Sequence, residues 1–374
     1  MENNEEKVEK TEAASAEGTT SQSETSASGA AVAAVKPGFG QKIVNAFRDF
    51  FTKEHLKEFA KNHIFDICAL GGLIICLIVF TVVPPLVNGP RASIWRPISI
   101  KTLISQISVY FILAIGAVFV YLMGCMDISV GYQVGVFGAV FIMIANSSNL
   151  FLALLTIIIM GLACAIFNAF VGAYVKLPTV MSSVILMQLF NGVLLSIFDD
   201  KGINEIVLGQ DISVISSTWF RVLALVLLAI VAFYLLTFTK IGKRSRAIGT
   251  NKLAADQAGA NLLKTRIICY CVFSVFLCLG AVMLIAKSNS IASSDTVTYQ
   301  MDIMIMLLMG GMPLSGGMKG KLFNAIIGTF TYVLLNRGLS ACSVPTAYIM
   351  LVKSLVFVII VCLTCRKPGN LLPR

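Results

Sequence analysis

The amino-acid sequence predicts an all-α polytopic membrane protein of about ten transmembrane helices. Hydrophobic residues make up 57% of the chain and charged residues only 13%, and the mean hydropathy is +0.86. A soluble domain carries about 25% charged residues. Because one bilayer crossing takes roughly 20 apolar residues, a chain of 374 residues has room for many crossings and little else. A soluble globular fold is therefore excluded.

The helices are predicted from ten apolar runs that follow one another from Ile64 onward. Polar or proline-containing breaks separate the runs, and the third and the eighth are short. The runs are 64–88, 102–123, 130–146, 150–174, 178–198, 218–239, 266–286, 300–313, 321–338 and 345–365. They place one membrane domain at 64–370.

The N-terminal part of the chain has a different composition. Residues 1–38 are acidic and rich in Ser, which predicts a disordered cytoplasmic tail because such a segment buries little apolar area. Residues 39–63 alternate Phe and Ile with Lys and Arg near helical spacing, which predicts an amphipathic helix at the membrane surface. The alternative is that 39–63 is only the polar start of the first crossing. His55 and His63 lie here without a cysteine or acidic cluster, so no metal site is expected.

Basic residues predict the orientation in the membrane. The segment 240–266 holds seven Lys and Arg residues against one acid, Asp256, and positive loops stay in the cytoplasm. An even number of crossings returns the C-terminus to the side of the N-terminus. We therefore expect both termini and 240–266 to be cytoplasmic. The net charge of +10 is then explained by membrane topology, and no nucleic-acid partner is expected.

Charged residues in apolar surroundings are the candidates for function, since each is costly in a bilayer unless it is paired or faces water. Asp127 and Asp302 each lie beside a glycine-rich stretch, and Lys353 lies within the tenth run. The two acids could brace interrupted helices around a translocation path, or simply cap helix ends or contact headgroups. Lys353 needs a partner in either case, and the sequence does not say whether it is Asp302.

No group of residues in the sequence has the pattern of a catalytic, cofactor or metal site. The ten cysteines lie mostly inside apolar runs, as buried cysteines do, and the Cys362–Cys365 pair ends a helix without the context of a redox motif. We therefore expect a protein that is not an enzyme and that carries no cofactor of its own.

Three stretches carry a resemblance to the permeases of ribose, galactose and xylose ABC importers, a family related to the branched-chain amino acid permeases. Met126–Gly131 (MDISVG) is similar to the family's Gly-Ile-Asp-Leu-Ser-Val-Gly, and Tyr299–Gly320 to its Tyr-Glu-Leu-Asp and glycine-rich segment. Between them, Thr239–Gly259 resembles the family's cytoplasmic loop. The residues of the first two stretches that match the family or line the path are Asp127, Ser129, Gly131, Asp302, Gly310, Gly311, Gly316 and Gly317. The chain departs from the family where Cys125 replaces a glycine and Gln300 an acid, and where Met312-Pro313 replaces Thr-Ser.

The resemblance implies the sugar-type ABC importer permease fold and a bacterial cytoplasmic membrane. It also implies a set of partners: cytoplasmic ATPase subunits that use the ATP, a second permease copy in a homodimer or heterodimer, an extracytoplasmic sugar-binding protein, and membrane lipid. The loop 240–266 would be the coupling element, with a short helix near 252–259 seated on the ATPase. Its coupling residues would be Gly249, Asn251, Ala254, Ala255 and Gly259. Small side chains there, Ala258 included, would permit close docking.

The expected function is alternating-access uptake of a monosaccharide. Asn168, Gln188 and Asn191 are candidates for a weakly binding path, although amides in membrane helices also serve interhelical bonding. The same machinery could carry nucleosides or branched-chain amino acids. An ion-coupled secondary carrier is the alternative from another class, and it predicts buried charge pairs and no docking loop.

Overall fold

The computed structural model describes residues 64–89, 93–174, 178–199, 204–292, 297–313, 315–318 and 320–364. The predicted tail 1–38 and the predicted surface helix 39–63 lie outside the described residues, as do both histidines. All structural statements below concern the described part of the chain.

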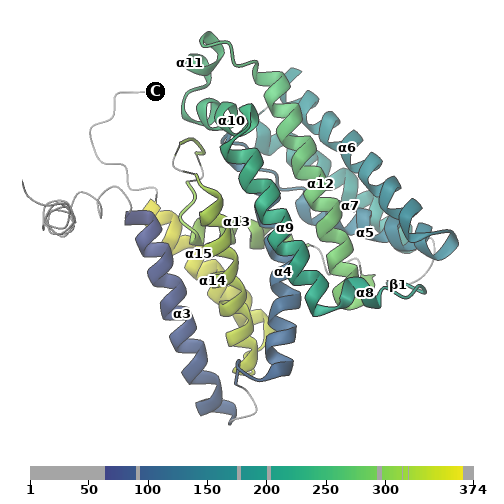
Figure 1. Ribbon diagram of the computed structural model, residues 1–374, viewed down its shortest axis with the longest axis vertical. Helices are drawn as coiled ribbons and strands as arrows, with labels where there is room; N and C mark the ends of the chain where they lie inside the picture. The colour runs from purple at the N-terminus through teal and green to yellow at the C-terminus, as the bar shows by residue number, and fades with distance from the viewer. Residues whose placement is uncertain are drawn as a thin grey trace, which may run out of the picture. The chain divides into compact units, whose positions relative to one another are not determined.

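Helices occupy each of the ten predicted runs, so the all-α prediction is confirmed (Figure 1). They are α3 (Ile64–Asn88), α4 (Pro97–Tyr121), α5 (Val130–Ser147), α6 (Leu150–Tyr174), α7 (Thr179–Asp199), α9 (Thr218–Thr237), α12 (Leu262–Ser288), α13 (Tyr299–Met309), α14 (Leu322–Ala341) and α15 (Thr346–Thr364). Among the described residues, seven helices are long and apolar enough to cross a membrane by themselves, and α13 and α15 are shorter apolar helices. The twenty residues of α14 include polar Asn324, Asn336 and Arg337.

The predicted boundaries differ from the observed ones mainly where capping residues decide them. α4 begins five residues before the predicted run because Pro97 suits the first helical turn. α12 begins at Leu262, since the Asn261 side chain accepts a hydrogen bond from the backbone N–H of Lys264. α13 ends at Met309 and not at residue 313, because Gly310 and Gly311 follow it directly.

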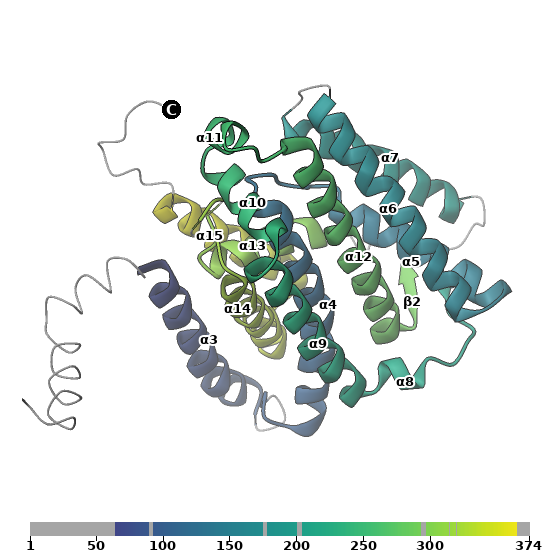
Figure 2. The same cartoon turned by 45° about the horizontal axis from the view of Figure 1, so that its top comes forward.

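Five short elements lie between the long helices. They are β1 (Glu205–Val207), α8 (Ser213–Ser216), α10 (Lys240–Thr250), α11 (Lys252–Gln257) and β2 (Ser290–Ala292). α8 precedes α9 and α10 follows it, so the two lie at opposite ends of that helix (Figures 1 and 2). The end with α10 and α11 is the one that the distribution of basic residues predicts to be cytoplasmic.

The core is built around α4 and α12, which pack along each other. Most of α4 is buried, and α12 also packs on α6 and α5. Glycine lets the two central helices approach: a Cβ on Gly280 of α12 would overlap the side chain of Leu113 on α4. α3, α6, α7, α9 and α15 expose apolar side chains outward, as helices in contact with lipid or another membrane chain do.

At the end opposite α10, β1 and β2 form a two-stranded antiparallel ribbon, which the sequence analysis did not predict. Ile206 pairs with Ile291, whose side chain is fully buried. Asn146 at the end of α5 holds the ribbon, because its Nδ2 donates to the carbonyl of Val207 at 3.0 Å and its Oδ1 accepts from the N–H of Gly209 at 2.8 Å. The loops before α8 and before α13 are thereby joined.

Candidate functional site

The carboxylate of Asp127 is buried in the stretch between α4 and α5, outside the helical spans. Its Oδ1 accepts hydrogen bonds from the backbone N–H of Ser129 at 2.9 Å and from Ser129 Oγ at 2.5 Å. Its Oδ2 accepts from Asn168 Nδ2 of α6 at 2.9 Å. Burial raises the pKa of Asp127, and the hydrogen bonds from Ser129 and Asn168 act in the opposite direction. Neutral donors thus satisfy both carboxylate oxygens inside the protein.

The same network extends to two further helices. Gln133 Nε2 of α5 donates to Ser129 Oγ at 2.6 Å, and Ser182 Oγ of α7 donates to Asn168 Oδ1 at 3.4 Å. Gly131 lies buried in the first turn of α5 beside these groups in sequence. Asp127 therefore joins the start of α5 to α6, and through Asn168 to α7. It is 3% exposed, which places it away from headgroups.

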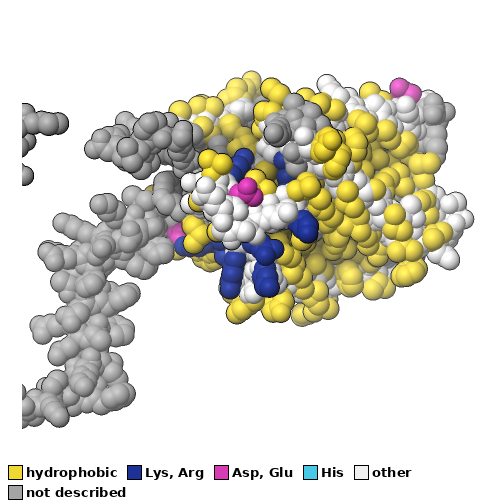
Figure 3. Space-filling view, turned by 90° about the horizontal axis from the view of Figure 1, so that it is seen from above, with side chains coloured by type: hydrophobic (Ala, Val, Ile, Leu, Met, Phe, Trp, Pro, Cys, Tyr) yellow, Lys and Arg dark blue, Asp and Glu magenta, His cyan; other side chains and the backbone are white. Residues whose placement is uncertain are grey.

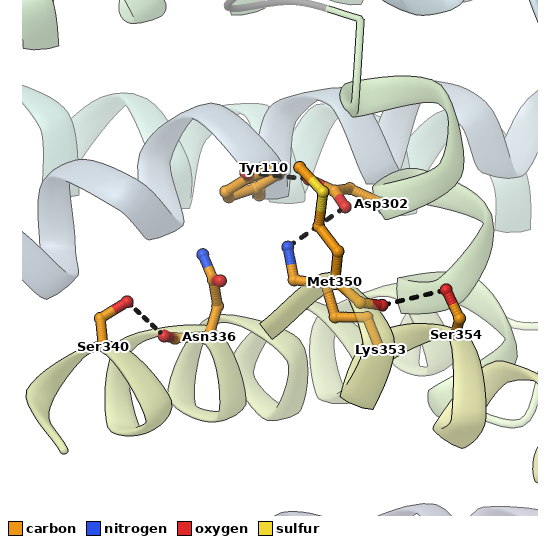
Figure 4. A network of polar contacts seen from close by, with 7 residues as sticks. All are labelled: Tyr110, Asp302, Asn336, Ser340, Met350, Lys353 and Ser354. Carbon is orange, nitrogen blue, oxygen red and sulfur yellow. Dashed lines mark hydrogen bonds and ion pairs between the residues drawn. The ribbon is translucent and has the colours of Figure 1, made fainter. Parts of the chain in front are cut away.

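The carboxylate of Asp302, also 3% exposed, is the centre of a second polar cluster, shown in Figure 4. Tyr110 Oη of α4 donates to Asp302 Oδ2 at 3.1 Å, and Lys353 Nζ of α15 lies 3.5 Å from Asp302 Oδ1. The side chains of Lys353 and Asp302 are 13% and 5% exposed. The partner of Lys353 that the sequence left open is therefore Asp302.

Aromatic rings surround this ion pair. The Lys353 ammonium lies 4.9 Å from the centre of the Tyr332 ring, where a cation is attracted by the face of the ring. Tyr110 packs edge-on against Tyr332 and tilted against Tyr299, with ring centres 5.5 and 5.2 Å apart. The cluster thus connects α4, α13, α14 and α15. Its tyrosines could not be singled out from sequence, because they come from helices far apart along the chain.

The glycine-rich stretch after α13 forms a tight turn against other backbone. Gly311, Gly316 and Gly317 have φ values of +82°, +70° and +97°, which glycine adopts without the cost that a side chain brings. Gly310 lies against the backbone of Asn324 in α14, and a Cβ there would overlap the carbonyl oxygen. These four glycines thus serve close backbone approach and turn geometry.

A short helix, α11, lies where the coupling helix was predicted, and it ends at Gln257 with Asn251 as its N-cap. Asn251 Oδ1 accepts hydrogen bonds from the backbone N–H groups of Leu253 and Ala254. Ala255 is only 5% exposed, so the expectation that it forms part of an exposed small-residue surface is wrong: it is the residue of α11 that packs inward.

The exposed residues of α11 are Lys252, Leu253, Ala254, Asp256 and Gln257, and Ala258 and Gly259 directly after the helix are exposed too. Leu253 is the large apolar side chain among them and is 77% exposed. Leu253 was not among the residues predicted from sequence, although an exposed leucine on a short polar helix is a signal of a docking site. Figure 3 shows Lys and Arg side chains gathered at this end of the molecule among hydrophobic ones.

The three predicted path amides are not brought together. Asn168 is buried and bonded to Asp127. Gln188 is exposed on the outer side of α7, and Asn191 is half-buried on the same helix. In the described part of the chain, no group of three His, Cys, Asp or Glu residues could hold a metal ion.

The fold is that of a multi-pass membrane protein with two buried polar clusters and a basic segment at one end. The family model described as branched-chain amino acid transport system / permease component matches residues 99–361, and the chain belongs to this family.

Curated relatives are permeases whose names give different solutes. The ribose import permease of Escherichia coli (strain K12) is 26% identical over 303 residues, which cover 78% of this chain and 93% of the relative. The xylose transport system permease of Haemophilus influenzae is 26% identical over 322 residues, covering 68% and 85%. The autoinducer 2 import permease of Photorhabdus luminescens is 24% identical over 253 residues, covering 66% and 76%. No solved structure matches the chain.

Proposed function

We propose that this chain is the permease subunit of an ATP-driven importer that moves a monosaccharide into the cell, and that separate ATPase subunits supply the energy. The observation that carries the proposal is the exposed, apolar-tipped α11 beyond the end of α9, on a surface rich in Lys and Arg. A carrier driven by an ion gradient has no need of such a docking helix. The permease family and the names of the relatives support the same function.

ATPase docking would follow from the shape of α11. Leu253 would insert into an apolar groove of the ATPase, while the small side chains of Ala254 and Ala258 and the backbone of Gly259 would allow close approach around it. When two ATPase subunits close on ATP, they would pull α11 and tilt the helices between inward-open and outward-open states. No covalent chemistry in this chain is needed.

The translocation path is proposed along the exposed face of α7. Gln188 lies near the middle of that helix, and an amide facing lipid at this depth would lack hydrogen-bond partners. A second permease copy across from α7 would enclose a path in which Gln188 and Asn191 bind sugar hydroxyls weakly. Asn168 would contribute indirectly, since it is already bonded to Asp127. An extracytoplasmic binding protein would deliver the sugar at the end that carries α8.

The solute is proposed to be a monosaccharide such as ribose, galactose or xylose, with nucleosides and branched-chain amino acids as alternatives for the same machinery. Identities of 26%, 26% and 24% to relatives with different solutes do not rank them. Competition among unlabelled solutes for uptake of labelled ribose separates these possibilities, because only true substrates or close analogues compete.

One observation favours a second candidate, the ion-coupled carrier: the buried Asp302–Lys353 pair is a charge pair of the kind that such carriers use. The deciding experiment purifies the tagged protein from its own host in mild detergent and reconstitutes it. The importer proposal expects a co-purifying ATPase and uptake that stops when ATP is removed. Purification without an ATPase, together with uptake that needs only a proton gradient, would establish the carrier instead.

A matched pair of variants tests the docking surface. Leu253→Glu places a charge on the exposed tip of α11 and should remove the ATPase from the purified complex. Ala247→Glu places the same charge on the exposed side of α10 and should leave attachment intact. Equal retention of the ATPase in both variants would refute docking through α11.

A further inference from the structure

Three segments far apart in sequence meet at the cytoplasmic end of the molecule. They are the end of α4 with the residues after it (121–124), the end of α10 (249–250), and the turn 315–318 that follows α13. The backbone N–H of Gly317 donates to the carbonyl oxygen of Leu122 at 2.9 Å. The turn is therefore fixed to α4 on one side.

On the other side, the Thr250 hydroxyl fastens the turn to α10. Thr250 Oγ1 accepts a hydrogen bond from the backbone N–H of Met318 at 3.2 Å, and it donates to the carbonyl oxygen of Arg246 at 2.9 Å. One hydroxyl thus connects the last turn of α10 to the 315–318 turn. Asn251, the next residue, caps α11.

The contact has no side chains between the backbones that could absorb movement. A Cβ on Gly249 would lie 2.5 Å from the backbone nitrogen of Gly317 and would overlap the carbonyl oxygen of Leu122. A Cβ on Gly316 would lie 2.6 Å from that same oxygen. Close-packed backbone transmits displacement because it cannot be compressed.

The turn lies in the connection between α13 and α14, which carry residues of the Asp302 cluster. α13 precedes the turn in the sequence and α14 follows it. The two helices also touch through glycine, because a Cβ on Gly328 would overlap the carbonyl oxygen of Met306. α13 carries Asp302, which binds α4 and α15 through Tyr110 and Lys353. A displacement of the turn would therefore move α13 and the Asp302 cluster inside the membrane domain.

We infer that Thr250 and the 315–318 turn form the mechanical connection through which movement of α10 and α11 reaches α13 and α14. The inference rests on the proposed function, since it needs an ATPase that moves α11. Thr250 acts here as a positioning residue: it contacts neither solute nor ATP and transmits motion through its hydroxyl.

The experiment uses the complete complex, purified from the host through a tag on this chain and reconstituted in liposomes. It measures co-purifying ATPase, ATP hydrolysis and solute transported per ATP. Thr250→Val removes the hydroxyl at nearly constant volume, and Thr250→Ser retains it. Thr237→Val makes the same chemical change at an exposed position on the last turn of α9.

For Thr250→Val we expect normal ATPase attachment and continuing hydrolysis, with transport per ATP lower by about fivefold, the equivalent of one neutral hydrogen bond. Thr250→Ser and Thr237→Val should keep the wild-type ratio. Gly249→Ala, which forces the backbones apart, should lower the ratio at least as far while α11 stays attached.

An unchanged ratio in both Thr250→Val and Gly249→Ala would overturn the inference, and so would equal loss in Thr250→Ser and Thr250→Val. Loss of the ATPase from Gly249→Ala would also overturn it, because the position would then serve attachment. Failure of the proposed function looks different: the wild-type protein itself would purify without an ATPase.

Discussion

The Asp302–Lys353 pair puts two full charges where each alone would be costly. The pair is neutral as a unit, Tyr110 satisfies the second carboxylate oxygen, and Tyr332 presents its ring face to the ammonium. Breaking such a pair from one side leaves a buried charge, whereas removing both charges does not. The buried carboxylate of Asp127 is stabilised differently, because its hydrogen-bond partners are neutral donors and not a cation.

A double-mutant comparison should show this asymmetry. We expect Asp302→Asn or Lys353→Gln alone to lower the free energy of unfolding by about 3 kcal/mol, and the double variant to recover much of the loss. Unfolding by SDS titration in mixed micelles measures it. The control is Lys321→Gln, which breaks the Lys321–Asp66 ion pair of 2.6 Å, where Lys321 is 45% exposed. It should cost less than about 1 kcal/mol. Additive losses in the double variant would contradict the pairing.

The Asp127 network should depend on Asn168 more than on the other path amides. Asn168→Leu leaves Asp127 Oδ2 without its donor inside the protein, so we expect a loss of roughly 1–3 kcal/mol in the free energy of unfolding. Asn191→Leu, at a half-buried position on α7, should change stability little but should slow uptake if α7 lines the path. Equal stability of both variants would mean that the Asp127–Asn168 bond contributes nothing.

At the scale of elements, some glycines allow two helices to pack backbone to backbone, and others lie in open space. α13 and α14 touch backbone to backbone at Gly310 and Gly328, while Gly192 on α7 has open space around it. The same chemical change should therefore have opposite effects at the two kinds of site.

Gly328→Ala should destabilise the protein by roughly 1–3 kcal/mol, since its methyl group would force α13 and α14 apart. Gly192→Ala adds a methyl group into open space and improves helix propensity, so stability should stay level or rise by up to about 1 kcal/mol. Thermal unfolding of the two purified variants compares them directly. A harmless Gly328→Ala would show that the two helices do not pack through this glycine.

Much of the element-scale architecture could be predicted from sequence, because the bilayer sets the length of each apolar run. Charge placement indicated the basic loop 240–266, and the family resemblance implied its short helix. Contacts between distant parts of the chain could not be predicted from sequence. The partner of Lys353 lies 51 residues away. The ribbon of β1 and β2 joins two loops through strands of only three residues each. The inward direction of Ala255 likewise depends on how α11 docks on its own chain.

For the whole molecule, the expected orientation in the membrane gives the order in which the described features lie from the cytoplasm to the outer side. α11 would lie in the cytoplasm, the Thr250 junction next to it, the Asp302 cluster deeper, and the ribbon on the outer side. ATP-driven movement of α11 at the cytoplasmic end would then displace the transmembrane helices.

Epitope insertions test this orientation. A tag after Leu253 should be inaccessible to antibody in intact spheroplasts and accessible after permeabilisation, because α11 is expected inside. A tag after Val214, which is 71% exposed in α8, should be accessible in both. Untagged protein and the ATP-dependent uptake of the protein tagged after Val214 serve as controls, whereas the tag after Leu253 is expected to abolish uptake because it interrupts the proposed ATPase surface. The reversed pattern would place the ATPase surface on the wrong side and exclude the proposed function.

The ribbon of β1 and β2 has a consequence for how the domain can open. Because its strands are hydrogen-bonded to each other and clamped to α5 by Asn146, the outer ends of α7 and α12 are tied together. We expect those ends to act as a pivot, so that a small rotation there would displace the opposite ends of the same helices the most. The helix ends that the ribbon joins would stay together while the opposite ends of α7 and α12 move apart.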